Sequence, residues 1–207
     1  MSDYEEIIYT YKNNVYLNIT NKCPCACTFC IRSKTDAIGE ASNLWLNHNP
    51  DFDEVKKAID NFDFSNCKEA VFCGYGEPTN SFDVLIKSAQ YLRSLGIKTR
   101  VNTNGLGSLV NGRDISKELC DNIDAVSISL NCSNKDEYLK TVRPKFGIES
   151  YDAMLDFAKK CRAYTPNVAL SVVDVIGDEE VAKCQKIADK LNIPLRVRKY
   201  SGQFGEQ

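Results

Sequence analysis

Four cysteines lie within eight residues near the start of the chain, and they constrain its fold and chemistry more than any other feature. The stretch reads Cys23-Pro24-Cys25-Ala26-Cys27-Thr28-Phe29-Cys30. Cys23, Cys27 and Cys30 follow a Cys-x3-Cys-x2-Cys spacing, and thiolates are the ligands that iron–sulfur clusters select. Three cysteines in so short a loop can hold three corners of a four-iron cluster. One iron then stays open, and an open coordination position is where a metal site does chemistry.

A structural zinc site is the alternative for this loop. Cys25 would then supply a fourth thiolate beside Cys23, Cys27 and Cys30, and the chain would be a zinc-binding structural or adaptor protein. Zinc loops usually combine two cysteine pairs that lie far apart in sequence, and the sequence has no second pair. A disulfide framework is disfavoured as well, because the ten cysteines show no regular spacing. The sequence favours an iron–sulfur centre and leaves zinc as the alternative.

Length and charge limit the remaining classes of protein. With 207 residues and a net charge of -2, we expect a single domain over residues 1–207. A nucleic-acid binder that acts through bulk charge is not indicated. The acidic N-terminus lacks the basic and apolar plan of a signal peptide, and no apolar run reaches membrane-spanning length. We therefore expect a cytoplasmic protein that is not inserted in a membrane.

Strands and helices are expected to alternate along the chain. The first strand is predicted over 15–20, directly before the cysteine loop, and a long loop over 31–50. Five more strands are predicted over 69–73, 98–102, 125–130, 168–176 and 195–200, and helices over 51–62, 81–95, 114–121, 134–141, 149–162 and 181–191. Such alternation is typical of a parallel sheet covered by helices. Six units are fewer than the eight of a closed barrel, so we predict an α/β fold, an open partial (βα)6 barrel with mainly parallel strands.

A glycine-rich turn follows the second of these expected strands. Residues 74–79 read Gly-Tyr-Gly-Glu-Pro-Thr. Glycines allow a ligand to approach the backbone closely, and a proline makes the turn rigid. The Glu77 carboxylate can accept hydrogen bonds from an ammonium group. Taken alone, this run also fits an ordinary strand-to-helix turn.

Together, the cysteine loop and the Gly-Glu-Pro run resemble the radical S-adenosylmethionine (radical SAM) superfamily. The resemblance implies a [4Fe–4S] cluster on Cys23, Cys27 and Cys30, whose open iron holds the amino acid end of S-adenosyl-L-methionine. An electron, supplied by an external donor of the flavodoxin or ferredoxin type, would cleave the cofactor to a 5′-deoxyadenosyl radical that abstracts hydrogen from a substrate. The alternative within this chemistry is an activase that installs a radical on a glycine of a partner protein.

The compact size, the lead-in at 18–21 (Asn-Ile-Thr-Asn) and the Cys-Pro-Cys run are most similar to the small radical SAM proteins associated with TatD-type nucleases. This subgroup implies no settled substrate.

The resemblance also assigns cofactor contacts to particular residues. Gly76, Glu77 and Pro78 are expected to bind the cofactor's amino group, and Gly74 is expected to shape the turn. Phe29 is expected near the adenine. The alternative role of Phe29 is to pack the cysteine loop onto the barrel.

The strand at 125–130 supplies further candidates, because polar and apolar residues alternate along it. A strand inside a parallel sheet has no solvent face, so its polar face would point into the barrel. Ser129 and Asn131 are expected at the ribose or the methionine carboxylate. Some relatives carry an acid and a lysine here, and in their absence Arg143 is the candidate partner for the carboxylate.

Several other polar residues follow predicted strands. Asn104, together with Asn102, ends the third expected strand and is expected to face the site. Arg198 and Tyr200 on the last strand would reach the cofactor or the substrate, and Cys132 would line the site.

The lateral gap of an open barrel raises the question of how a radical is shielded from water. The loop at 31–50 is expected to cover part of the mouth, with Leu44, Trp45 and Leu46 as an apolar plug. Only residues 201–207 follow the last expected strand, so we expect a large substrate or a partner protein to close the gap. The alternative is a small substrate held beneath the loop alone.

Overall fold

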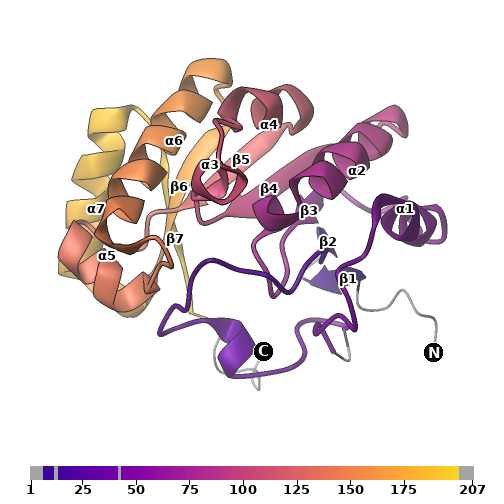
Figure 1. The fold of residues 1–207 in the computed structure, drawn as a ribbon, viewed down its shortest axis with the longest axis horizontal. Helices are drawn as coiled ribbons and strands as arrows, with labels where there is room; N and C mark the ends of the chain where they lie inside the picture. Colours follow the sequence, from indigo (N-terminus) through magenta and orange to yellow (C-terminus); the bar gives the residue numbers. More distant parts are fainter. Residues whose placement is uncertain (1–6, 12–13, 42, 201–207) are drawn as a thin grey trace.

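A computed structural model describes residues 7–11, 14–41 and 43–200 of the chain. They form an α/β fold around one sheet whose seven strands follow one another in the order of the chain (Figure 1). The acidic N-terminus and the tail at 201–207, on which two of the sequence expectations rest, lie outside the described residues. The strands are β1 (Ile8–Tyr11), β2 (Asn14–Leu17), β3 (Ala70–Phe72), β4 (Thr99–Thr103), β5 (Ala125–Ser129), β6 (Val168–Val173) and β7 (Leu195–Arg198).

The pairing of these strands confirms the predicted open partial barrel. Strands β2 to β7 pair in parallel, and β1 and β7 form the two edges of the sheet. Strand β1 pairs with β2 in the antiparallel sense and was not predicted. Its first two residues, Ile8 and Tyr9, are both buried, so the strand lacks the alternation of apolar and polar side chains that marks a half-buried strand.

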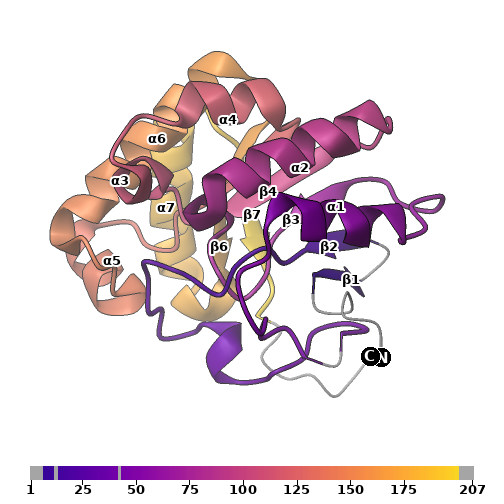
Figure 2. The same cartoon turned by 45° about the vertical axis from the view of Figure 1, so that its right-hand side comes forward.

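The helices cover one face of the sheet. Figure 1 and Figure 2 show α1, α2, α4 and α6 packed in succession along the outer side of the strands, and neighbouring pairs of them are in contact. The stripes predicted for the long helices are buried, for example Leu85, Ala89 and Leu92 on α2. The helices are α1 (Phe52–Asp60), α2 (Phe82–Ser94), α3 (Gly107–Asn111), α4 (Ser116–Asn122), α5 (Lys135–Val142), α6 (Ser150–Tyr164) and α7 (Asp178–Leu191), with short 3-10 turns at η1 (Ile31–Ser33), η2 (Pro78–Ser81), η3 (Gly147–Glu149) and η4 (Asp174–Ile176).

Some helical assignments differ from the sequence predictions, among them the 3-10 turn η2 at Pro78–Ser81. The short helix α3 was not predicted, and residues 174–176 form a 3-10 turn where the sequence predicted the end of a strand. The loop predicted over 31–50 is confirmed, since only three of its described residues are helical.

The opposite face of the sheet is concave and polar. Residues that pair across parallel strands share a face, so the register puts Asn102 of β4 beside Ser127 of β5. Likewise, Ser129 lies beside Ser171 of β6. The intervening residue Ile128 is fully buried on the helix side. The polar face expected for the strand at 125–130 therefore points into the barrel.

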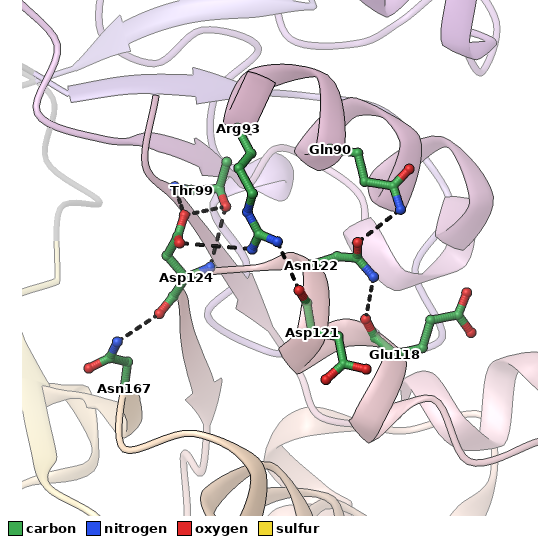
Figure 3. Close-up of polar contacts among 8 residues, drawn as sticks. All are labelled: Gln90, Arg93, Thr99, Glu118, Asp121, Asn122, Asp124 and Asn167. Atoms are coloured by element: carbon green, nitrogen blue, oxygen red, sulfur yellow. Dashed lines mark hydrogen bonds and ion pairs between the residues drawn. The ribbon is translucent and has the colours of Figure 1, made fainter. Parts of the chain in front are cut away.

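A polar network holds the starts of the central strands together (Figure 3). The Asp124 carboxylate accepts hydrogen bonds from the backbone N–H and the hydroxyl of Thr99, at 2.7 and 3.0 Å. The Asn167 side chain donates to the Asp124 carbonyl at 3.0 Å. Arg93 of α2 reaches the carbonyl of Asp121 at 2.9 Å. These contacts join β4, β5 and the start of β6 at the end of the barrel opposite the cysteine loop.

Among the described residues, every helix is too short or too polar to cross a lipid bilayer.

Candidate functional site

The cysteine loop lies at the carboxyl ends of the strands, where its backbone is held by the segment that follows α5. Cys25 forms an isolated antiparallel bridge with Pro144. On either side of this bridge, the N–H of Lys145 donates to the Pro24 carbonyl at 2.7 Å, and the N–H of Thr28 donates to the Thr141 carbonyl at 2.9 Å. The loop is therefore fixed along half its length by a segment more than 110 residues away in the sequence (144 minus 25 is 119).

The Gly-Glu-Pro turn contacts the residues that lead into the cysteine loop. The N–H of Glu77 donates to the Lys22 carbonyl at 2.8 Å. A Cβ atom at Gly76 would lie 2.1 Å from the Thr20 carbonyl oxygen, and one at Gly74 would lie 2.0 Å from Oδ1 of Asn18. Both glycines are thus required by the close approach of the protein's own chain, whereas the sequence analysis explained them by the approach of a ligand.

The thiols of the loop interact with one another. Contact with the Cys25 thiol lowers the pKa of Cys23 and of Cys27, and the pKa of Cys25 itself is strongly raised. Burial raises the pKa of Cys30, which lies farther along the loop. Cys25 is buried, and the three predicted cluster ligands are partly exposed. In the part of the chain that the structure describes, no three His, Cys, Asp or Glu side chains converge on a metal-binding geometry.

Arg32 lies next to this loop and was missed in the sequence analysis. Its guanidinium donates to the Cys25 carbonyl at 3.1 Å and to the Tyr75 carbonyl at 3.4 Å. Its charge also opposes the burial that raises the pKa of Cys30. The signal in the sequence was a basic residue two positions after the last cysteine. Arg32 ties the loop to the glycine-rich turn and places positive charge near the thiols.

Asn104 contacts the same thiols from the end of β4. Its side-chain N–H group lies 3.5 Å from Sγ of Cys25 and 3.9 Å from Sγ of Cys23. Its backbone N–H donates to Oε2 of Glu77 at 2.7 Å. Asn104 therefore connects the cysteine loop with the Gly-Glu-Pro turn, and Asn102 lies on the concave face below it.

The Glu77 carboxylate is buried and receives four hydrogen bonds from the protein. Oε1 accepts from the N–H and the hydroxyl of Thr79, at 3.2 and 2.8 Å, and from the Thr103 hydroxyl at 2.7 Å, while Oε2 accepts from Asn104. Burial raises the pKa of this carboxyl, and the hydrogen bonds oppose the rise. Glu77 thus joins the ends of β3 and β4. Its predicted contact with the cofactor's amino group stays a prediction.

The remaining predicted cofactor contacts lie at different depths. Asn131 is buried directly after β5, adopts a left-handed backbone (φ 61°) and has a side-chain oxygen without a hydrogen-bond partner among the described residues. Ser129 is half-buried at the end of β5, and Phe29 is half-buried in the cysteine loop. Pro78 is buried at the start of η2.

Arg143 and Cys132 occupy contrasting surroundings. Arg143 is an exposed, left-handed residue at the end of α5 (φ 49°), and its side chain donates to the Lys140 carbonyl of its own helix at 3.3 Å. Cys132 is buried, and burial raises its pKa to about 11. Tyr200 is exposed and its backbone N–H donates to Asp174.

The loop after η1 packs against the glycine-rich turn, and Figure 1 shows it as the violet segment beneath the strands. Leu44 and Tyr75 are buried in a small apolar cluster with Tyr9. Trp45 meets the Tyr75 ring edge-on at 5.0 Å, and its indole N–H donates to Asp36 at 3.0 Å. The predicted plug of Leu44, Trp45 and Leu46 is therefore buried or half-buried on the β1–β2 side of the barrel.

Comparison with known proteins yields one family match and a set of similar folds. A family model described as the radical SAM superfamily matches residues 17–191. No curated protein matches the chain.

Among solved structures, a radical SAM methyltransferase from Sphaerobacter thermophilus is 13% identical, with a TM-score of 0.63 over 93% of this chain and 68% of that one. SuiB from Streptococcus suis is 18% identical, with a TM-score of 0.58 over 89% of this chain and 39% of that one. anSMEcpe, solved with AdoMet bound, is 16% identical, with a TM-score of 0.61 over 93% and 52%. The chain thus spans about half the length of anSMEcpe and less of SuiB.

Proposed function

The chain belongs to the radical SAM superfamily, and we propose that it is a radical SAM enzyme with one [4Fe–4S] cluster on Cys23, Cys27 and Cys30. The observation that carries this proposal is the placement of the cysteine loop. Its backbone is fixed against residues 141–145 on one side and meets the Gly-Glu-Pro turn on the other. Three thiol ligands in one loop at the carboxyl end of β2 supply the donor chemistry that an iron–sulfur cluster takes.

The chain also offers groups that fit S-adenosylmethionine. The Asn131 side-chain oxygen is a buried acceptor beside the end of β5 that has no partner in the described part of the chain, and such an atom calls for a ligand donor such as a ribose hydroxyl. Ser129 and the turn from Gly74 to Pro78 border the same end of the barrel. Together the cluster and cofactor would supply a 5′-deoxyadenosyl radical for hydrogen abstraction.

Around that chemistry, the chain's own residues position the thiols and exclude water. Asn104 and Arg32 place hydrogen-bond donors and positive charge beside the cysteine loop. Such groups favour the thiolate form that metal binding needs. The packed loop with Leu44 and Tyr75 shields one side of the barrel.

Ligand identity is tested by replacing each cysteine of the loop with alanine. We expect Cys23→Ala, Cys27→Ala and Cys30→Ala each to lose the visible absorbance and the four irons of anaerobically reconstituted protein. Cys25→Ala is the matched control within the same loop, and it should retain the cluster. Zinc in place of iron in the anaerobic protein, or loss of the cluster in Cys25→Ala, contradicts the proposal and supports the zinc alternative.

The open side of the barrel suggests which partners the protein needs. We expect an external electron donor of the flavodoxin or ferredoxin type. A large substrate or a partner protein would cover the gap, and an activase acting on a partner glycine is the second candidate function. Anaerobic incubation with reductant and labelled cofactor, with and without such partners, asks whether 5′-deoxyadenosine forms and where its added hydrogen came from. Fast coupled turnover with a small metabolite alone contradicts the need for a second chain.

Subgroup and location are part of the same proposal. The size, the lead-in at 18–21 and the Cys-Pro-Cys run support a place among the small TatD-associated radical SAM proteins. Ten cysteines without regular spacing support a reducing, cytoplasmic location.

A further inference from the structure

Two arginines lie on the last strand of the sheet. Arg196 and Arg198 are two residues apart on β7, so they share one face of the strand. In the register, Arg196 pairs with Ser171 and Arg198 with Val173. Ser171 in turn pairs with Ser129 of β5. Both arginines therefore lie on the concave side of the barrel, the face that carries the serines.

These two arginines differ from the others in the chain. Within the described residues, neither makes a hydrogen bond or an ion pair, although arginine carries five donors. Arg100, on the same concave wall, is held by Glu69 at 2.8 Å and by Asn102 at 2.8 Å. Each of the other five also donates to a carboxylate or a carbonyl oxygen, namely Arg32, Arg93, Arg113, Arg143 and Arg162. Among the residues that the structure describes, the β7 arginines are the guanidinium groups left available for a ligand.

A cavity adjoins this wall. It has a volume of about 140 Å³ and is lined by Arg100, Ser127, Asn167 and Arg196, with the small residues Ala125 and Ala169 among its other walls. This space is large enough for several water molecules, and hence for one phosphate or carboxylate group.

Two further observations indicate that the wall is positive and incompletely satisfied. The Ser171 hydroxyl, whose residue pairs with Arg196, is buried and has no hydrogen-bond partner in the described part of the chain. Cys73 lies across the barrel, at the end of β3. Burial raises the pKa of its thiol, and the charges of Arg198 and Arg100 oppose that rise. Arg198 therefore acts across the interior.

We propose that the β4–β7 wall of the barrel binds a substrate through an oxyanion, a phosphate or a carboxylate, with Arg196 as its principal ligand. Arg198 contributes nearer the mouth. The guanidinium fork matches both anions with paired hydrogen bonds. This inference rests on the proposed function, because it assigns a substrate class to that same barrel.

The position of the cavity adds a constraint on the substrate. Its lining begins at Ala125, the first residue of β5, whereas the cysteine loop lies beyond the other end of the strand. Four residue steps along a strand span about 13 Å. The lining also includes Ser127, two steps or about 7 Å from the end of β5, so the anionic group would lie roughly 7–13 Å below that end and several bonds from the carbon that reacts.

The test is an isothermal titration of the anaerobically reconstituted protein with two probes, inorganic phosphate and malonate, at an ionic strength held constant with chloride. The two probes distinguish a phosphate from a carboxylate substrate. We expect saturable binding of at least one probe. Arg196→Gln should weaken it roughly tenfold to a hundredfold, the loss expected for a charge-assisted hydrogen bond. Arg198→Gln should weaken it less.

Two further variants make the result specific. Arg196→Lys keeps the charge and removes the fork, so it should bind more weakly than the unsubstituted protein and more tightly than Arg196→Gln. Lys190→Gln removes the same charge from exposed α7, on the outer layer, and should leave binding unchanged. An equal loss in Lys190→Gln and Arg196→Gln overturns the proposal.

Absence of saturable binding by both probes also overturns it, as does preferential binding of a single-stranded oligonucleotide, which indicates a polyanion surface. Reductive cleavage of S-adenosylmethionine is measured in the same unsubstituted preparation. Cleavage without anion binding contradicts only the substrate class. Anion binding without a cluster or cleavage contradicts the proposed function.

Discussion

The two edges of the sheet differ in how far the chain covers the concave face beside them. At the β1–β2 edge, Tyr9 and Tyr75 are buried together with Leu44 of the loop that follows η1. At the β7 edge, Val197 is 51% exposed, and both arginines of that strand are exposed as well. One edge is covered by the chain itself, and the other is open within the described residues.

The difference follows from the side chains that each edge presents to neighbouring segments. The loop docks on the covered edge through Asn18, whose side chain donates to the Leu44 carbonyl at 2.7 Å and accepts from the Tyr75 N–H at 3.3 Å. Aromatic rings fill the space around these bonds, including the Tyr9–Tyr16 stack at 5.1 Å. Strand β7 presents charged side chains, and charge is costly to cover without a partner.

This contrast indicates that the two edges of the barrel have different roles. Water is excluded at the covered edge by apolar and aromatic packing. At the open edge, charge stays exposed within the described residues, where the proposed anionic substrate would bind. Substitutions at the two edges measure how far they differ in their contribution to the free energy of unfolding.

The largest effect is expected from Leu44→Ala, at the covered edge. Leu44 is fully buried, so its truncation leaves a cavity and should cost about 2–5 kcal/mol. For a chain of this size, that lowers the melting temperature by roughly 4–20 °C. Thermal unfolding of the anaerobic protein measures the change. Val197→Ala is the counterpart at the open edge, and it should cost less than about 0.5 kcal/mol. Equal losses at the two positions would show that the edges are equally packed.

A smaller effect is expected from Tyr75→Phe. The Tyr75 hydroxyl donates to the Thr35 carbonyl, and the loss of this bond should cost about 1 kcal/mol at neutral pH. Tyr164→Phe on exposed α6 is the control, because its side chain is half exposed, and it should change stability by less than about 0.5 kcal/mol.

The same variant has a signature at alkaline pH. Burial raises the pKa of Tyr75 to about 12, and the nearby Asp36 carboxylate adds to the rise. Between about pH 10 and pH 12 the unfolded chain releases this proton while the folded chain keeps it, so stability falls as the pH rises. Tyr75→Phe lacks this loss, and the gap between the two proteins should therefore narrow over that range. A gap that stays constant would mean that the phenol is not buried.

Some elements of the fold could be predicted from the sequence and others could not. Alternation of strands and helices was enough to predict six parallel units, because each carries its own hydrophobic period. Strand β1 was missed because its buried residues, Ile8 and Tyr9, are consecutive and give no alternation. Helix α3 was missed because its five residues span little more than one turn, which is too short for a helical period.

At the candidate site, contacts between residues far apart in the sequence could not be predicted. Arg32 was not predicted, and its hydrogen bond to the cysteine loop depends on the fold of the whole barrel. Asn104 was expected to face the site, but its contact with the thiols could not be read from the sequence. The bridge between Cys25 and Pro144 likewise has no local sequence pattern. The cysteine spacing and the Gly-Glu-Pro run were recognisable because their chemistry is concentrated in a few consecutive residues.

The smallest effect is expected from Arg198→Gln, at the open edge. Arg196 and Arg198 lie about 7 Å apart along one face of β7, and neither has an ion-pair partner among the described residues, so they repel each other. Removing one charge should leave the stability within about 0.5 kcal/mol and shift it slightly upward at low salt. The gain should fade as the ionic strength rises, because salt screens exposed charges. Urea unfolding at two salt concentrations measures it, with Lys190→Gln as the control. A clear loss of stability at low salt would show that Arg198 contributes to folding and is not held free for a ligand.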